Sequence, residues 1–576
     1  MPKFSKRTIS RYIKTDCKKF LALELYRSET EKKLAIKYGM PEPIVARPSA
    51  NIFAKAGTKA EKLVYDLIKQ EFGDEYSIIF DKSKKSKENL LELFQNDLEK
   101  KLFLIEPEFL TDDLLEIFIN QFGESLNNFK DKLSISDIRP DILSVMIPQK
   151  NELYYEVKRD GSLQEINDDR ILLSVIDVKN TEKSNSGYDA EVVLYSILLT
   201  IWLEENQLSH KYAVTNKSGI FPAALKVNSF SEQYEPLNGI NIHEKYNELL
   251  SYVEYVEHDQ LVIALRNVMI NDLIPILKNP EDWENLEWHV GKKCGLCDWL
   301  AYEEWLSKEN KDKVTEKHCH SKALSIDHLS QIPFLSSAMR KVLSNDSLDT
   351  VSNIQKTSGE EDTYKKHSKL KIDSSLIPKR ANSIKNNDTS YEDRYIYNMP
   401  KFALTNIFIT LNFDPSTRIV SSIATKCYWQ EFSTYEDRKR YTNTRSFSTN
   451  SFFTEEGNDE SERDMLFYFL NQLYEYFVFA NSKENNPHPE FKQSTYHVYF
   501  WDRTQYEELK KLIGKHIGII LEHKLLKSLI WLFGTDEVLE DYQAVKSPNV
   551  TFIKDITELS HLILIDMLSK TTVSRA

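Results

Sequence analysis

The chain has 576 residues, of which 41% are apolar and 28% charged, so it can form about three or four folding units with sizeable cores. Its net charge is −13, from 75 Lys and Arg against 88 Asp and Glu, which argues against sequence-blind coating of nucleic acid. Glycine is scarce, with 15 residues, and no GxxxxGKS/T or GxGxxG loop occurs. These absences exclude the usual loops for nucleotide hydrolysis and dinucleotide binding.

No stretch reaches the roughly 18 consecutive apolar residues of a membrane span. The longest apolar run, Val192–Leu203, predicts a buried helix. The first residues are charged and lack the apolar core of a secretion signal. We therefore expect a cytoplasmic protein without a membrane partner, whose five cysteines are reduced and free to ligate metal.

Residues 1–40 are predicted to be helical, because apolar side chains recur every three to four positions. They carry eleven basic and four acidic side chains, which indicates either a docking site for a polyanion or a solvated helix face. A second helix is predicted over 58–73, and the mixed, charged segment 76–130 predicts peripheral helices.

Short β-like runs then predict a sheet. They cover Ile138–Met146, Leu153–Val157 and Ile171–Val178, with a hairpin turn at 159–162. The apolar helix 192–203 follows, and after it come strand-like runs at 212–214 and 224–227 and helices from about 245 to 306.

Carboxylates lie on two of these predicted strands. Asp141 follows a proline, and Asp177 and Lys179 form a D-x-K triplet after an apolar run. Alternation along a strand places Asp177 and Lys179 on the same face. Carboxylates of adjacent strands can hold Mg²⁺ or Mn²⁺, and a lysine beside the metal can orient or deprotonate the attacking water. The pattern therefore predicts phosphodiester hydrolysis.

A second triplet, Glu156-Val157-Lys158, also fits the E-x-K spacing. It leads straight into the predicted hairpin turn and lacks both the preceding apolar run and the following apolar helix. We therefore assign the site to Asp177 and Lys179.

The order of G-x-x-x-E, PD, D-x-K and a helix with a polar residue four before tyrosine resembles the RecB-like branch of the PD-(D/E)xK nucleases over residues 1–340. The resemblance implies a restriction-endonuclease-like core with Mg²⁺ or Mn²⁺ as cofactor. The family usually has Gln where this chain has Glu191, which leaves contact with metal, DNA or Lys179 open for that residue. The implied catalytic residues are Glu61, Asp141, Asp177, Lys179, Glu191 and Tyr195, of which Glu61, Asp141 and Asp177 are the metal ligands.

Four of the cysteines have the spacing of a metal centre. Cys294 and Cys297 form a C-x-x-C pair, Cys319 follows after 21 residues, and Cys17 lies far upstream. Four thiolates fit either a 4Fe-4S cluster or Zn²⁺. RecB-like nucleases of the AddB and CRISPR-adaptation kinds join the ends of the nuclease domain through a 4Fe-4S cluster, and this layout resembles theirs.

The last gap is longer than is usual in that family, so His318 or His320 could replace Cys319. Cys427 is predicted to be a buried apolar side chain rather than a ligand.

Three segments follow the cysteines. Residues 326–345 resemble a helix-hairpin-helix module whose hairpin glycines are replaced by Phe334 and Ser336. Residues 346–395 are polar and predict a linker. Residues 396–576 resemble the RNase H-like predicted exonuclease domain that follows some RecB-like nucleases. Thr410 and Asn412 stand where that domain needs metal carboxylates, so this copy is expected to be degenerate.

The expected molecule is an α/β protein with an iron–sulfur-stapled nuclease domain over 1–325 and a degenerate RNase H-like domain over 396–576. The resemblance implies a metal-dependent DNA nuclease, an exonuclease on single strands or DNA ends. It would serve recombination, repair or defence against foreign DNA, with a separate helicase as partner. The alternative is a catalytically silent DNA-binding or scaffold subunit of a larger complex.

Overall fold

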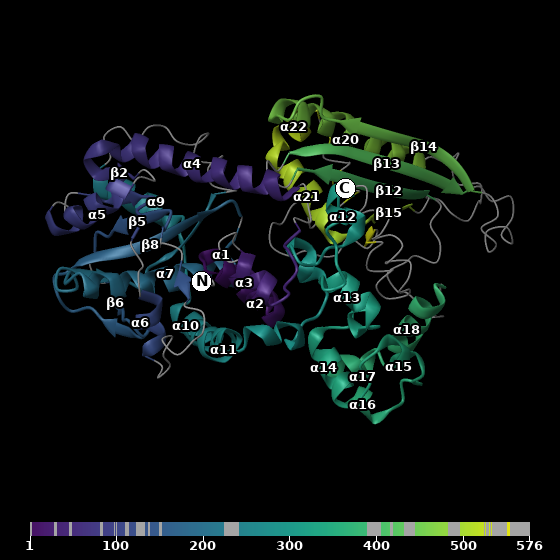
Figure 1. Cartoon of the computed structure of the whole chain (residues 1–576). Coiled ribbons are helices and arrows are strands. Elements are labelled where there is room, and N and C mark those ends of the chain that lie inside the picture. The colour runs from purple at the N-terminus through teal and green to yellow at the C-terminus, as the bar shows by residue number, and fades with distance from the viewer. Residues whose placement is uncertain are drawn as a thin grey trace. The chain divides into compact units, whose positions relative to one another are not determined.

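The computed structural model divides the chain into two compact units, residues 1–350 and 351–576, and each is considered by itself (Figure 1). The structure describes residues 3–27, 32–44, 49–80, 84–96, 98, 101–109, 114–121, 133–135, 139–148, 152–181, 183–223, 241–388, 405–414, 419–430, 444–481, 496–523, 525, 529, 532 and 550–552.

A seven-stranded mixed sheet forms the centre of the first unit. Its order is β11-β10-β8-β5-β3-β2, and β9 also pairs with β8. Strand β5 runs antiparallel to β3 and β8, whereas β9 and β10 run parallel to β8. The strands are β2 (Ser77–Ile79), β3 (Phe103–Ile105), β5 (Ile142–Val145), β8 (Ile171–Lys179), β9 (Tyr212–Val214), β10 (Gly219–Pro222) and β11 (Glu254–Tyr255).

Helices pack on both faces of β8, and this explains its nearly continuous apolar run. On one face, Ile176 and Val178 belong to the same core cluster as Val64 and Ile68 of α4 (Ser49–Tyr76). On the other face, Val175 shares a cluster with apolar residues of α7 (Ser186–Glu205). Asp177 alternates with Val178, so its side chain lies on the α7 face of the sheet.

The predicted N-terminal helical region is confirmed as three helices, α1 (Lys6–Thr15), α2 (Lys18–Leu25) and α3 (Lys32–Lys37). Helix α1 lies side by side with α7 (Figure 1). The approach is close because Gly187 has no side chain: a Cβ there would lie 2.4 Å from the backbone oxygen of Ser10.

The prediction of peripheral helices over 76–130 is confirmed only in part. Strands β2 and β3 lie in this segment and extend the central sheet, beside helices α5 (Lys84–Asn96) and α6 (Leu114–Asn120). Each strand has only three residues, too few to show a clear alternation. The expected strand at 224–227 lies outside the described residues; the strand that pairs with β8 is β10, just before it.

The expected hairpin is confirmed as β6 (Tyr155–Val157) and β7 (Leu163–Glu165), with Gly161 at a φ of 81° in its turn. A short parallel pair joins β1 (Lys3–Phe4) to β4 (Ser134–Ile135).

Helical structure continues through α9 (Ile242–Ser251), α10 (His258–Asn267), a π-helical turn (Val268–Leu273) and α11 (Ile274–Lys278). The stretch His258–Lys278 is long and apolar enough to cross a membrane by length and composition. One side of it is packed in the core of the first unit through Leu265, Met269 and Leu273, and core helices pass the same test.

Short helices complete the first unit: 3₁₀ turns at Pro280–Asn285, Lys292–Leu296, Glu303–Trp305 and Leu329–Gln331, and α12 (Lys308–Lys311), α13 (Cys319–Ser325) and α14 (Ser337–Asn345). Phe334, in the hairpin between α13 and α14, has a φ of 62°. In a helix-hairpin-helix module this position is a glycine. Here phenylalanine occupies it and adopts the left-handed conformation that favours glycine.

The second unit begins with four helices where the sequence predicted a linker. They are α15 (Val351–Gln355), α16 (Asp362–Lys365), α17 (Ser368–Ile372) and α18 (Leu376–Asn386). Buried Val351, Ile354, Leu370 and Ile377 pack inside this segment. The prediction fails over 351–388 because α15, α16 and α17 are short and each contributes only one or two apolar side chains to the interior.

A five-stranded sheet of order β14-β13-β12-β15-β16 forms the rest of the second unit. The first three strands are antiparallel, and β15 and β16 run parallel to β12. The predicted strand pair and helix are confirmed as β12, β13 and α20, and the segment at 556–569 lies outside the described residues. The elements are β12 (Thr405–Phe413), β13 (Val420–Gln430), β14 (Thr444–Phe453), α20 (Asp459–Asn481), β15 (Tyr496–Phe500), α21 (Arg503–Lys515), α22 (Ile517–Glu522) and β16 (Val550–Phe552).

Candidate active site and cysteine cluster

The pairing of β5 with β8 brings two of the predicted carboxylates together. Ile142 faces Ile176 in the antiparallel register, so Asp141 and Asp177 lie at the same place in the sheet. Asp141 Oδ2 accepts a hydrogen bond of 2.7 Å from the backbone N–H of Val178. Both side chains are buried, Asp177 completely.

The two carboxylates differ in their protonation. Burial and the charge of Asp177 raise the pKa of Asp141 well above its usual range. Burial also disfavours charge on Asp177, but the ammonium groups of Lys179 and Lys6 outweigh it and lower the pKa of that carboxyl. The pair is thus held with its negative charge concentrated on Asp177.

Two lysines supply the positive charge. Lys179 Nζ forms an ion pair with Asp177 and lies 3.9 Å from Glu191 Oε1 on α7. Lys6 Nζ, on α1, lies 3.5 Å from the same Glu191 oxygen. Burial disfavours charge on Lys179, but Asp177 and Glu191 raise its pKa above the usual range. Glu191 thus contacts Lys179, one of the roles that the sequence left open for it.

Tyr195 is buried one turn along α7, and Lys6 Nζ lies 5.9 Å from the centre of its ring. Sequence patterns did not identify Lys6, because it reaches the site only through the packing of α1 on α7.

Glu61 stands apart from this group. It lies on α4, and burial together with the nearby charge of Asp177 raises its pKa, partly offset by Lys179 and Lys6. Tyr65, one turn further along α4, has a buried hydroxyl without a hydrogen-bond partner among the described residues. No three Asp, Glu, His or Cys side chains in the described part of the chain are close enough to hold one metal ion as they stand.

The chemistry of the donors nevertheless suits a divalent cation. Asp177 Oδ1 is buried, and no N–H or hydroxyl group among the described residues donates to it; the polar partners of the Asp177 carboxylate are Lys179 and the carboxyl of Asp141. A hard cation prefers such carboxylate oxygens, and it would relieve the repulsion between Asp141 and Asp177. Asp141 and Asp177 fit a Mg²⁺ or Mn²⁺ ion, and Glu61 is the nearest carboxylate on α4 to complete the set.

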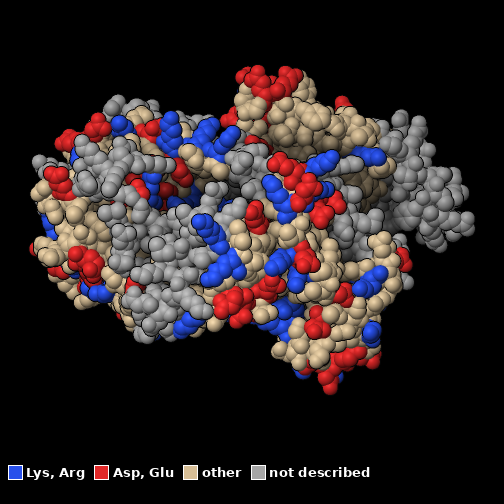
Figure 2. Space-filling view, in the orientation of Figure 1, with Lys and Arg blue, Asp and Glu red and all other residues tan. Residues whose placement is uncertain are grey.

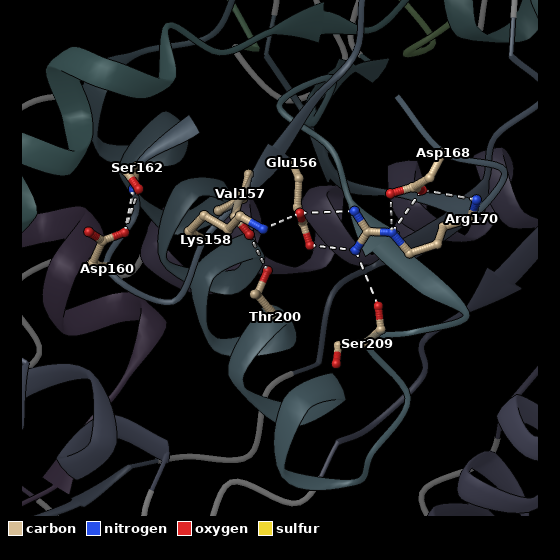
Figure 3. Close-up of polar contacts among 9 residues, drawn as sticks. All are labelled: Glu156, Val157, Lys158, Asp160, Ser162, Asp168, Arg170, Thr200 and Ser209. Carbon is tan, nitrogen blue, oxygen red and sulfur yellow. Dashed lines mark hydrogen bonds and ion pairs between the residues drawn. The ribbon is translucent and has the colours of Figure 1, made fainter. Parts of the chain in front are cut away.

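The competing E-x-K triplet is part of a separate ion cluster (Figure 3). Arg170 donates to both carboxylate oxygens of Glu156 at 2.7 and 3.0 Å and also holds Asp168 at 2.9 Å. Lys158 pairs with Glu156 from the other side. Burial raises the pKa of Glu156, but these cations lower it overall. Both Glu156 oxygens are thus occupied by the protein itself, which removes this triplet as a metal site.

The structure also brings the four predicted cysteine ligands together. Cys17 caps α2, Cys294 lies within the 3₁₀ turn Lys292–Leu296 that Cys297 caps, and Cys319 begins α13. Burial raises the pKa of Cys17 to about 11 and that of Cys319 to about 12, and the charges of the other thiols raise them further. Such mutual effects join every pair among the four. Residues more than 270 positions apart therefore lie near one another, although no three of the described cysteines are close enough to share one metal ion as they stand.

A buried lysine beside these thiols indicates a site built for negative charge. Lys19 is 2% exposed, and its ammonium lies 5.2 Å from the ring centre of Trp283 and 4.8 Å from that of Trp288. Burial lowers its pKa, which the thiols of Cys319 and Cys17 partly oppose. Thiolates bound to iron or zinc carry net negative charge, so the donor set fits such a centre.

The histidines beside Cys319 have other contacts. His318 accepts from the Thr315 N–H at Nδ1 and donates from Nε2 to the Glu42 carbonyl at 3.0 Å, so both ring nitrogens are used. The ring of His320 packs edge-on against Tyr302. Cys319 is therefore the ligand candidate. Cys427 is fully buried in the core of the second unit, as predicted.

Asp298, next to Cys297, binds the N-terminal helices through arginines. It is 6% exposed, and its Oδ2 lies 3.1 Å from Arg7 Nη2 and 2.5 Å from Arg27 Nη1. Arg11 Nη1 lies 3.9 Å from the same atom. This group, the Asp298 cluster, fastens α1 and α2 to the loop that carries Cys294 and Cys297.

In the second unit, Thr410 and Asn412 lie on the exposed face of β12. Gln505 donates to Thr410 Oγ1 at 3.2 Å, and Asn412 donates to Ser422 at 3.2 Å. Neither side chain provides a carboxylate oxygen for a metal.

Comparison of the chain with protein-family models, with curated proteins and with solved structures gives no match.

Proposed function

We propose that the first unit is a metal-dependent DNA nuclease of the RecB-like PD-(D/E)xK kind, acting on single strands or DNA ends. The observation that carries this proposal is the convergence of Asp141, Asp177 and Lys179 on the α7 side of the sheet, with an Asp177 oxygen to which no described N–H or hydroxyl group donates. The order α4, β3, β5, β8, α7 and then a strand parallel to β8 supports a restriction-endonuclease-like core.

Each residue of the site has its own role in the proposed reaction. Asp141, Asp177 and Glu61 would hold Mg²⁺ or Mn²⁺, which supplies Lewis-acid activation of a phosphoryl oxygen and a nucleophilic water. Lys179 is held in its ammonium form by Asp177 and Glu191, in position to orient the attacking water and to offset charge on the phosphate. Glu191 positions Lys179 and Lys6.

Local basic residues, rather than the overall charge, would bind the substrate. Exposed Lys55, Lys59 and Lys62 recur at helical spacing on α4, the helix that carries Glu61. Figure 2 shows blue side chains along this helix, and elsewhere on this face blue and red are interspersed. A local row of this kind can follow a phosphate backbone in an acidic protein.

The cysteine group would hold a 4Fe-4S cluster, or Zn²⁺ in the alternative, as a structural staple of the first unit. The second unit has the strand order of an RNase H-like domain, three antiparallel strands followed by two parallel ones. With Thr410 and Asn412 in place of carboxylates, it would serve to bind nucleic acid or a partner such as a separate helicase. Work in recombination, repair or defence against foreign DNA fits this combination.

One observation favours the second candidate function, a silent DNA-binding or scaffold subunit. Glu61 stands apart from Asp141 and Asp177, so three metal ligands are not gathered among the described residues. In that case the carboxylate site would grip a strand without cleaving it.

Cleavage of end-labelled single- and double-stranded DNA with Mg²⁺ or Mn²⁺ separates the two candidates. Asp177→Asn should reduce cleavage by about a thousandfold or more, because it removes the buried charge shared by metal and lysine. Glu156→Gln is the matched control, since that buried carboxylate belongs to the Arg170 cluster, and it should retain activity. Absence of cleavage by the wild-type protein, with DNA binding intact, would select the silent subunit.

A further inference from the structure

A third lysine, Lys14 of α1, lies beside the site and is placed there by a glycine. A Cβ at Gly187 would lie 2.7 Å from Lys14 Cε and 3.0 Å from Lys14 Cγ. Contacts this short do not occur with real Cβ atoms, so the stem of Lys14 passes over α7 only because residue 187 has no side chain. The Lys14 side chain thus lies along the surface of the first turn of α7.

The Lys14 ammonium lies over an aromatic ring that the proposed catalytic lysine, Lys179, also approaches. Lys14 Nζ lies 3.8 Å from the centre of the Tyr188 ring, and Lys179 Nζ lies 5.4 Å from the same centre. A cation at this distance is attracted by the ring quadrupole, which fixes its position. Lys14 and Lys179 are therefore neighbours on one partly exposed tyrosine.

The three lysines differ in their counter-charges. Lys179 pairs with Asp177, and Lys6 pairs with Glu191. Lys14 has no carboxylate within ion-pairing distance in the part of the chain that the structure describes.

The surroundings disfavour this uncompensated charge. Burial lowers the pKa of Lys14 and the positive charges of Lys179 and Arg11 lower it further, whereas the more distant carboxylates of Glu191 and Asp189 offset only part of the effect. An anion that arrives between Lys14 and Lys179 would remove this penalty.

We propose that Lys14 is a phosphate-binding residue of this site, which holds a backbone phosphate of the DNA strand next to the phosphate that is cleaved. The inference rests on the proposed nuclease function. A phosphodiester oxygen is the anion that a DNA-cleaving site brings within reach of a lysine beside Lys179. Tyr188 and Gly187 position Lys14 for this contact.

The first experiment measures steady-state cleavage of a labelled single strand with Mn²⁺ by the full-length protein. Lys14→Gln should raise KM about five- to tenfold and change kcat less than twofold, because one phosphate contact is lost while the reacting groups remain. Lys14→Arg should restore most of the affinity. Lys37→Gln is the matched control: Lys37 is an exposed lysine of α3 whose Nζ lies 5.0 Å from the Tyr38 ring centre, and its loss should leave KM unchanged.

The second experiment measures binding of the same strand to the Asp177→Asn protein at increasing salt. Loss of one phosphate contact should reduce the slope of log affinity against log salt by about 0.7, and Lys37→Gln should leave the slope unchanged. Gly187→Ala should weaken binding at least as strongly as Lys14→Gln, because the added Cβ meets both the Lys14 stem and the backbone oxygen of Ser10 and so displaces α1.

The possible outcomes distinguish the assignment of Lys14 from the proposed nuclease function on which it rests. If the wild-type protein cleaves DNA through Asp177 but Lys14→Gln has the KM and salt slope of the wild type, the assignment of Lys14 is wrong and the nuclease stands. If the wild-type protein neither binds nor cleaves DNA, the proposed nuclease function and the assignment of Lys14 are both wrong.

Discussion

Lys6 Nζ lies 3.5 Å from Glu191 Oε1, so the first helix of the chain places its ammonium against a buried carboxylate nearly two hundred residues away. The RecB-like nuclease family proposed above for this chain usually has a neutral amide at that position, and here the carboxylate is matched by a cation from α1. Burial and the charge of Asp177 raise the pKa of Glu191, and Lys179 and Lys6 partly oppose this.

We expect this pair to be coupled in stability. Lys6→Met should lower the free energy of unfolding by about 1 kcal/mol, a value reduced by the partial exposure of Lys6 to solvent. In the Glu191→Gln background the same substitution should cost little, because no buried charge is left behind. Urea denaturation of the four proteins of this double-mutant cycle gives the coupling, and strictly additive effects would show that the pair contributes nothing.

The sequence predicts the centre of this site well and its edges poorly. Asp177 and Lys179 follow a long apolar run, a local signal that also identifies the central strand. The contribution of Lys6 and Lys14 depends on the packing of α1 on α7, which no local pattern encodes. Glu156 is excluded as a metal ligand because Arg170 occupies its carboxylate, and Arg170 lies fourteen positions away and outside any motif.

The same reasoning applies to the fold. Long elements such as β8 and α7 have enough residues to show their period, and the sequence identifies them. Strands of three residues at 77–79 and 103–105 are too short to show it. The same holds for the helices over 351–372, which bury only one or two apolar side chains each, such as Tyr364 and Leu370.

The cysteines provide a second prediction. Anaerobically purified protein should be brown and contain about four irons per chain. Cys17→Ala should lose the metal and lower the melting temperature, since it disconnects α2 from the late cysteines. Cys427→Ala is the control, because this cysteine is buried in the other unit, and it should retain the iron. If the protein is colourless and contains one zinc per chain, the cysteines form a structural zinc site and the iron–sulfur assignment is wrong.

The second unit should contribute no hydrolysis of its own. In the full-length Asp177→Asn protein, prolonged incubation with Mn²⁺ should leave single- and double-stranded DNA intact, because Thr410 and Asn412 offer no carboxylate oxygen. Residual metal-dependent trimming that disappears on mutation of the second unit would contradict the degenerate assignment.

A pH dependence is expected from His497, which is 5% exposed on β15. Burial lowers its pKa to about 4, below the usual 6.5. Because the folded state resists protonation, the stability that neutral His497 contributes is complete above pH 6.5 and is lost as the pH falls toward 4. By linkage this loss is about 3 kcal/mol.

Unfolding of the wild type and of His497→Phe should be compared at pH 7.5, 5.5 and 4.5. The stability of the variant relative to the wild type should rise steadily as the pH falls. A difference that does not change with pH would show that His497 titrates normally.

The Asp298 cluster bears on the order in which the molecule matures. Arg7, Arg11 and Arg27 fasten α1 and α2 to the Cys294–Cys297 loop through a carboxylate, without any metal. The polypeptide itself thus brings the four cysteines near one another, so the proposed metal centre would enter a folded chain rather than drive its folding. We expect that a chain stripped of its centre by oxygen keeps its N-terminal helices docked and can be loaded again without refolding.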